Sequence, residues 1–303
     1  MNIRTTKQIR PFLVLILIAS LASCGGSGKK ENGSASLDTT SGGAEKAEVL
    51  QAIDSLLEIM PKPSAVPNII ARTGIEYNPA LLCEEAAIEK ANGNASATAF
   101  CLGVFGADIA YMTAYDKGKD AEKRFISAKK MADRIGISGT FDVHQLEQLR
   151  SNLINRDSLI ALTDEYIRRS SEILKKGEQT KDAALVSAGA VIEGMYITSS
   201  LIREYPSAGL PKEQVNQVLI PLYKTLFDQE ASVNNVIHLL GKTEADEESK
   251  KLMASLMELS GIYQQGNWKE KIASGQGKIS TELFDIKKLD EAIVKARNGM
   301  LQR

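Results

Sequence analysis

Two acidic residues interrupt apolar, helix-patterned segments of this chain. Asp108 follows the run Gly-Val-Phe-Gly-Ala, and Glu193 follows Ala-Val-Ile. A tyrosine stands three positions after each acid, Tyr111 and Tyr196 respectively. This spacing puts carboxylate and phenol on one face of a helix, where they can meet. Tyr115 continues the first face, seven positions beyond Asp108. These five residues predict a polar pocket inside the protein.

The chemistry of such a pocket has three interpretations. The carboxylates and tyrosines could orient a small ligand or a partner peptide, or Asp108 or Glu193 could act as a general acid or base. A third interpretation is structural, because a buried carboxylate is costly unless it is paired. A tyrosine, or a lysine or arginine from a neighbouring helix, would satisfy that need.

Motifs for metal, phosphate or nucleophilic chemistry are absent from the sequence. The two histidines, His144 and His238, belong to no metal-binding pattern. No nucleophile elbow is present, and the glycines near residues 275–278 do not form a phosphate-binding loop. We therefore expect no cofactor, no metal site and no catalytic residue that the sequence can name.

The elements that must position these side chains are helices. Apolar residues recur at helical spacing from residue 44 onward, without sustained alternation of period two. We expect an all-α domain, either an irregular helical bundle or an α-solenoid of antiparallel helix pairs, with at most partial likeness to tetratricopeptide repeats. The expected helices span 44–60, 65–73, 79–92, 95–116, 118–136, 142–154, 158–176, 179–204, 211–240, 244–265 and 284–301. The segment 266–280 is expected to be a loop.

Small residues also follow one stripe of the helix that carries Asp108. Gly103, Ala107, Ala110 and Ala114 lie at positions i, i+4, i+7 and i+11. Such a stripe predicts close approach of another helix, because the side chains at the contact set the interaxial distance.

Two cysteines, Cys83 and Cys101, lie within the expected helical domain. In an oxidising compartment they are permitted to form a disulfide. The alternative is that both behave as small hydrophobic side chains in the core. The sequence does not choose between the two.

The first 23 residues have the layout of a secretory signal peptide. Arg4, Lys7 and Arg10 precede an apolar run of about a dozen residues, which is short for a membrane-spanning helix of about 20. The run ends in Leu-Ala-Ser-Cys24, which resembles the lipobox of bacterial lipoproteins. We therefore expect a lipid on Cys24, with several acyl chains that make membrane attachment stable.

Residues 24–43 are rich in glycine and serine and predict a flexible tether between the lipid and the domain 44–303. Gly25 rather than aspartate follows the lipid site, which by resemblance favours the outer membrane of a Gram-negative cell, at its periplasmic face or at the cell surface.

Loss of the three basic leader residues changes the formal net charge from −1 to −4. A mildly acidic chain is a poor ligand for nucleic acid.

The segments around Asp108 and Glu193 also carry a resemblance. Gly103-Val-Phe-Gly-Ala-Asp and Ile192-Glu-Gly-Met-Tyr, in this order, resemble an uncharacterised family of all-helical lipoproteins from Bacteroidota. Phe105 stands where that family carries a tyrosine. The resemblance implies a helical fold and a cell-envelope location, but it transfers no functional residue.

From anchor, tether and helices we expect a non-enzymatic envelope lipoprotein that binds a protein partner or organises an envelope complex. The alternative hypothesis is a small-molecule-binding lipoprotein with a pocket at Asp108, Tyr111, Glu193 and Tyr196. An enzyme that uses these carboxylates is the third.

Overall fold

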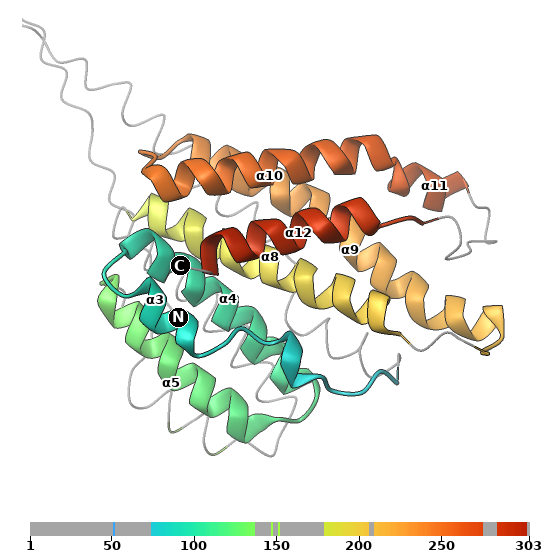
Figure 1. Cartoon of the computed structure of the whole chain (residues 1–303), viewed down its shortest axis with the longest axis horizontal. Coiled ribbons are helices and arrows are strands. Elements are labelled where there is room, and N and C mark those ends of the chain that lie inside the picture. The colour runs from blue at the N-terminus through green and yellow to red at the C-terminus, as the bar shows by residue number, and fades with distance from the viewer. Residues whose placement is uncertain are drawn as a thin grey trace, which may run out of the picture. The chain divides into compact units, whose positions relative to one another are not determined.

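The computed structural model describes residues 51, 74–136, 147, 151, 179–205, 209–274 and 284–301. Within these ranges the chain is an all-α helical bundle (Figure 1) without a strand. A short 3-10 helix, Pro79–Leu81, precedes the helices α3 (Ala86–Ala91), α4 (Ala95–Ala114), α5 (Gly118–Arg134), α8 (Thr180–Glu204), α9 (Lys212–Gly241), α10 (Glu247–Gly266), α11 (Trp268–Ser274) and α12 (Lys287–Leu301).

Most expected helices that fall in the described ranges are confirmed to within a few residues at their ends. The expected helix 79–92 is instead divided into the 3-10 turn and α3. Cys24, the tether 25–43 and the expected helices 44–60, 65–73, 142–154 and 158–176 lie outside the described residues, apart from 51, 147 and 151.

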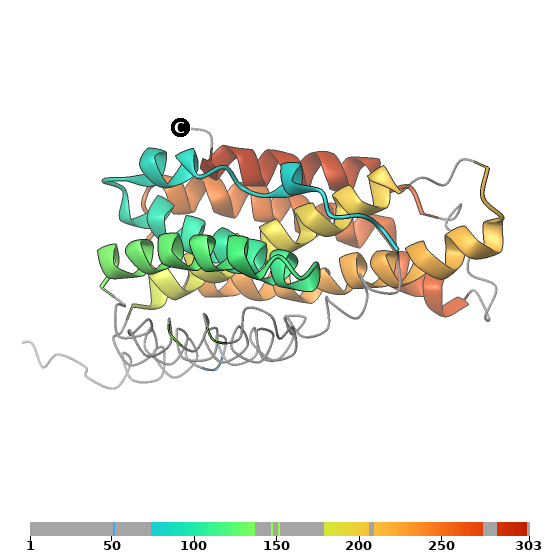
Figure 2. The same cartoon turned by 90° about the horizontal axis from the view of Figure 1, so that it is seen from below.

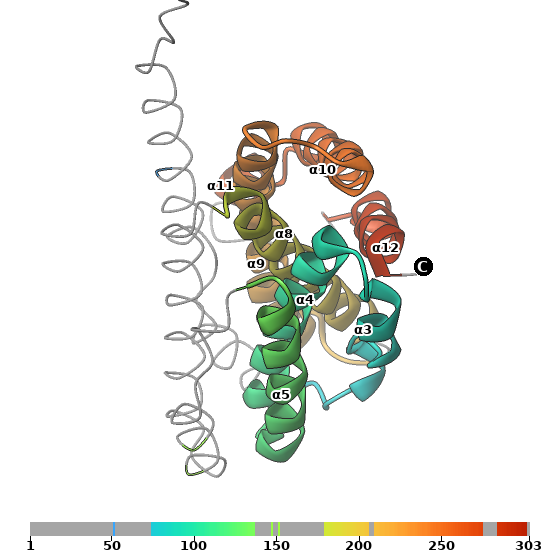
Figure 3. The same ribbon diagram turned by 90° about the vertical axis from the view of Figure 1, so that its left-hand side faces the viewer.

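Helices α4 and α8 form the centre of the bundle. They make the most extensive helix–helix contact, and in the end-on view they lie between α5 on one side and α10 and α12 on the other (Figure 3). Both helices are long and apolar enough to cross a membrane by length and composition, but 83% and 67% of their apolar windows are buried inside the protein. Burial against neighbouring helices accounts for their apolar character, since a helix that is hydrophobic on all sides needs cover on all sides.

Two glycines allow the backbones of α4 and α8 to touch. A Cβ atom built on Gly103 would overlap the carbonyl oxygen of Val186, and one built on Gly189 would overlap that of Phe100. No side chain fits at either position. The close approach predicted from the small-residue stripe is confirmed at Gly103, and its partner Gly189 supplies the matching gap on α8.

The two central helices run in the same direction. Near their N-termini, Ser96 and Lys181 both bind the carboxylate of Asp246. Towards their C-termini, Tyr111 and Glu204 both contact Asn78. The intervening α5 packs against α4 (Figure 2). The centre of the bundle is thus a pair of parallel helices rather than the antiparallel pair expected of a solenoid.

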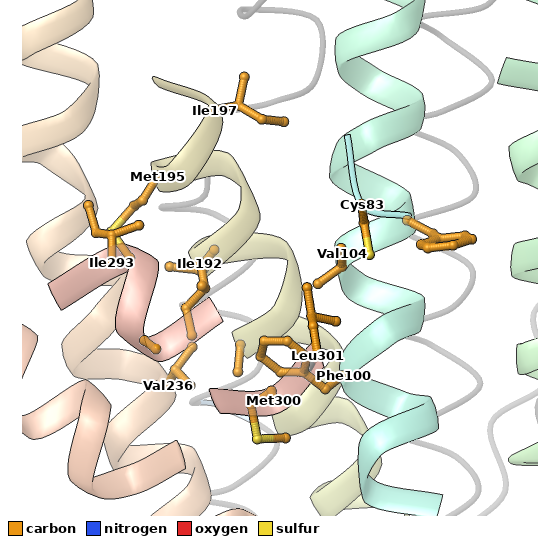
Figure 4. Close-up of a cluster of buried hydrophobic side chains, with 14 of the residues drawn as sticks. Cys83, Phe100, Val104, Ile192, Met195, Ile197, Val236, Ile293, Met300 and Leu301 are labelled. Carbon is orange, nitrogen blue, oxygen red and sulfur yellow. The ribbon is translucent and has the colours of Figure 1, made fainter. Parts of the chain in front are cut away.

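The core between α4, α8 and α12 is apolar apart from a few charged groups described below. Figure 4 shows this core, with Phe100 and Val104 from α4, Ile192 and Met195 from α8, and Ile293, Met300 and Leu301 from α12, all of them buried. The side chain of Cys83 also lies in it.

The expected loop 266–280 is wrong for its first part. Asn267 adopts the left-handed conformation (φ 52°) and ends α10, and α11 begins directly at Trp268. The indole ring stacks on Phe227 at 4.7 Å and meets Tyr263 edge-on at 5.7 Å. Burial of this ring holds α11 against α9 and α10. The glycine-rich sequence around Trp268 does not predict this tertiary contact.

Candidate functional site

Asp108 on α4 and Glu193 on α8 meet in the core of the bundle. Both side chains are fully buried, with 0% exposed, and each carboxyl group affects the pKa of the other. Sequence analysis offered a tyrosine or a cation from a neighbouring helix as the partner of each acid, and the structure places an arginine beside each. Since two buried carboxylates repel, the pair needs positive charge or a proton beside it.

Arg297 on α12 holds Glu193 in a two-point contact. Its Nε and Nη2 atoms donate to the two carboxylate oxygens at 2.6 and 2.8 Å. The guanidinium group also lies over the ring of Tyr196, 4.1 Å from its centroid. Every charge in this half of the cluster is therefore compensated by a short, bidentate contact of the strongest kind found in proteins.

Arg124 on α5 makes a looser contact with Asp108. Its Nη1 atom lies 3.7 Å from Oδ2 of Asp108 and 3.9 Å from Oε1 of Glu85, beyond hydrogen-bonding distance in both cases. The guanidinium group stacks on the ring of Phe105 at 4.2 Å, while its Nε and Nη1 atoms have no hydrogen-bond partner. Asp108 instead accepts a hydrogen bond from the backbone N–H of Cys83 at 3.2 Å.

Burial, and then the charge of Glu193, raises the pKa of Asp108 well above its ordinary value. Burial also raises the pKa of Glu193, although the hydrogen bonds from Arg297 lower it. Glu193 has two short contacts with Arg297, whereas Asp108 has none of that strength with Arg124, so the rise in pKa is opposed less strongly at Asp108. Arg124 therefore lacks a short hydrogen bond to its buried neighbour.

The tyrosines do not bind the carboxylates as the sequence spacing suggested. The hydroxyl of Tyr111 accepts a hydrogen bond from the backbone N–H of Asn78 at 3.1 Å. Tyr77, Tyr111 and Tyr115 form an aromatic cluster with centroid distances of 5.0–5.5 Å. Tyr196 serves as the platform for Arg297. The structural interpretation, pairing with arginines of neighbouring helices, is the one that the geometry bears out.

Cys83 and Cys101 are free, buried thiols and form no disulfide. Burial, with smaller contributions from Asp108 and Glu193, raises the pKa of the Cys83 thiol above its ordinary value. Burial raises the pKa of Cys101 to about 12. Both therefore remain protonated and unreactive in the folded protein, as small hydrophobic side chains of the core.

A cavity of about 380 Å³ opens beside the ionic cluster and not within it. It lies between the 3-10 turn, the N-terminal end of α3, the C-terminal end of α4 and the first turns of α5. Its lining consists of Tyr77, Pro79, Leu82, Glu85, Met112, Asp120, Lys123 and Arg124. Asp108, Tyr111 and Glu193, where a pocket was expected, are buried in the core, Tyr196 is partly buried, and none of the four lines this cavity. Arg124 is the group that lines the cavity and also contacts Asp108.

The rest of the described surface offers little else. Met257 is the one large hydrophobic side chain that is well exposed among the described residues, at 57%. In the same ranges no group of three or more histidine, cysteine or acidic side chains is arranged to hold a metal ion.

The sequence analysis missed Arg124, Arg297 and Tyr77. Each arginine lies on an amphipathic helix that carries several other basic residues, so residue type alone did not predict that it would be buried. One signal was present: two acids in apolar helices require two cations, and the cations had to come from other helices. Comparison with known proteins adds no further residue, since no family model, curated protein or solved structure matches the chain significantly.

Proposed function

We propose that this protein is a lipid-anchored binding protein of the bacterial cell envelope, which holds a small ligand in the cavity beside Arg124 and performs no chemistry on it. The cavity carries the proposal. Its volume of about 380 Å³ lies at the lower end of the 300–1,000 Å³ typical of small-molecule sites. Its lining combines apolar and aromatic side chains with four charged ones, so it is more polar than most small-molecule sites and suits a charged ligand.

The buried carboxylates argue against an enzyme. Asp108 and Glu193 are 0% exposed and do not line the cavity. A general acid or base must come within hydrogen-bonding reach of the proton that it transfers. The carboxylates that do line the cavity, Glu85 and Asp120, are more than half exposed. We therefore prefer binding to catalysis.

Binding of a protein partner is the second candidate. The helical bundle and the tether suit the presentation of a surface, and this hypothesis stays a prediction. We place it second because the described residues expose a single large hydrophobic side chain, Met257. Stable protein interfaces usually bury an apolar centre.

Native mass spectrometry of the full-length lipoprotein, extracted from membranes in detergent, tests the proposal. We expect a bound small molecule in the wild type and its loss in Leu82→Trp, which fills the cavity. Met257→Trp is the matched control, because the new ring lies on the surface and leaves the cavity open. Wild-type protein without a bound molecule, or equal retention by Leu82→Trp, would contradict ligand binding at this site.

The anchor has its own test. Replacement of Cys24 by alanine removes the proposed lipid acceptor and should move the protein from the membrane fraction to the soluble fraction. A protein that stays in the membrane fraction after this change is held there by something other than lipid on Cys24.

A further inference from the structure

The charged side chains of the cavity are arranged as a dipole. Asp120 and Lys123 form a contact of 3.4 Å with each other and cancel. The other two charges, Glu85 and Arg124, lie 3.9 Å apart without a hydrogen bond, and their side chains are 60% and 7% exposed. The cavity therefore has a positive group at its inner wall and a negative group at its rim.

Arg124, the inner charge, has hydrogen-bond donors without acceptors. The Nε and Nη1 atoms of Arg124 have no hydrogen-bond partner, and its two carboxylate neighbours stand at 3.7 and 3.9 Å. Burial of donors without acceptors is unfavourable, and a guanidinium group is shaped for two-point contact with a carboxylate. A small rotation of this side chain towards the cavity would present such an edge to a ligand.

The rim charge, Glu85, has one hydrogen-bond donor within the protein. Ser127 donates a hydrogen bond to Oε2 of Glu85 at 3.2 Å, while Oε1 faces Arg124. A ligand cation at the mouth of the cavity would meet Glu85 there. The uncharged part of the lining is Tyr77, Leu82 and Met112, together with Pro79, which suits an apolar group.

We propose that the ligand is a small zwitterion with an apolar side chain, of the class of free α-amino acids, with its carboxylate against Arg124 and its ammonium group towards Glu85. This inference rests on the proposed function and names the chemistry of the same cavity. The volume of about 380 Å³ admits one such molecule with some water rather than an extended peptide.

Isothermal titration of the full-length lipoprotein in detergent tests the inference with three kinds of probe. The first is a panel of L-leucine, L-methionine and L-phenylalanine. The second, the N-acetylated amino acids, lacks the ammonium group, and the third, the amino acid amides, lacks the carboxylate. We expect at least one free amino acid to bind about tenfold or more tightly than both of its derivatives, because each derivative loses one charge-assisted contact.

Two variants assign the charges. Glu85→Gln should weaken binding of the free amino acid several-fold and leave the N-acetyl derivative unchanged. Arg124→Lys keeps the positive charge but loses the two-point contact of the guanidinium group with a carboxylate. It should weaken binding of both the free and the N-acetylated compound. Glu247→Gln is the control for Glu85, because Glu247 is an exposed acid at the start of α10 and should change neither.

The outcomes separate this inference from the proposed function. If native mass spectrometry finds a small molecule that Leu82→Trp loses, but no free amino acid binds better than its derivatives, the zwitterion is wrong and ligand binding stands. If neither experiment detects a ligand, both fail. Equal effects of Glu85→Gln on the free and N-acetylated compounds would also overturn the assignment of the ammonium group.

Discussion

The two halves of the buried ionic cluster contain the same residue types and differ in how tightly these are held. Each half has one acid from a central helix, one arginine from an outer helix and one aromatic ring beneath the guanidinium group. Arg297 binds both oxygens of Glu193 at 2.6 and 2.8 Å, whereas Arg124 stops 3.7 Å from Asp108.

This difference follows from the surroundings. Arg297 lies on α12, which packs against α8 and α10, and it does not line the cavity. Arg124 lies on α5 and borders the cavity, and it makes no short hydrogen bond to Asp108. A buried arginine with a complete set of partners stabilises the fold, while one with an incomplete set is available to a ligand.

The largest effect should come from breaking the tight half. Arg297→Met leaves Glu193 buried without its cation, which costs about 3–5 kcal/mol of unfolding free energy. Urea titration of the purified protein measures this loss. Lys295→Met on the same helix is the control: its exposed pair with Glu258 should contribute about 1 kcal/mol or less. Similar losses for the two variants would show that the buried contact has no special weight.

Breaking the loose half should cost less. Arg124→Met keeps an apolar stem over the ring of Phe105 and removes a cation that makes no short hydrogen bond to Asp108. We expect a loss of less than about 1 kcal/mol in the same titration, because no short hydrogen bond between Arg124 and Asp108 is broken. A loss as large as that of Arg297→Met would make the two halves equivalent and remove the reason for assigning them different roles.

The raised pKa of Asp108 predicts a pH dependence of stability. Its pKa is raised in the folded state above 3.8, so folding takes up a proton, and the contribution is fully present below about pH 3.8 and is lost as pH rises through the folded-state pKa. Asp108→Asn removes this titration. The difference in unfolding free energy, variant minus wild type, should therefore increase from pH 4 towards pH 8. A difference that is constant across this range would place the proton elsewhere.

The smallest effect should come from the hydroxyl of Tyr196. The ring is the part that carries Arg297, at 4.1 Å from the guanidinium carbon, so Tyr196→Phe should change the unfolding free energy by less than about 0.5 kcal/mol. Tyr196→Ala removes the platform and should cost more. If both variants behave alike, stacking does not hold the tight half in place.

The helices could be predicted from the sequence because local signals mark them. Asn94 caps α4 through Ala97, and Asp246 caps α10 through Ser249. The 3.6-residue periodicity gives the amphipathic α5 and α12 directly. The short α11 escaped because its stability comes from Trp268 stacking on Phe227, and a contact between two helices leaves no periodic trace in either.

The site could be predicted only in part. Asp108 and Glu193 stood out because an acid inside an apolar helix demands compensation. Their partners did not, because Arg124 and Arg297 come from helices on which a basic residue is ordinary. Spacing within one helix suggested the tyrosines as partners. The parallel arrangement of α4 and α8 instead brought the two acids together, and no local pattern encodes it.

The crossing at Gly103 and Gly189 joins two helices that are far apart in the chain. Helix α4 has no polar face, and α8, which covers it most, comes only after α5 and the residues that follow α5 in the chain. The chain between α4 and α8 must close into a loop, at a cost in conformational entropy, before the two helices can make the contact that stabilises them. We therefore expect α4 to stay incompletely packed until α8 has been made, and the rate-limiting step of folding to be the docking of these two glycines. A residue larger than glycine at either position would then act on the folding rate as well as on the stability of the final state.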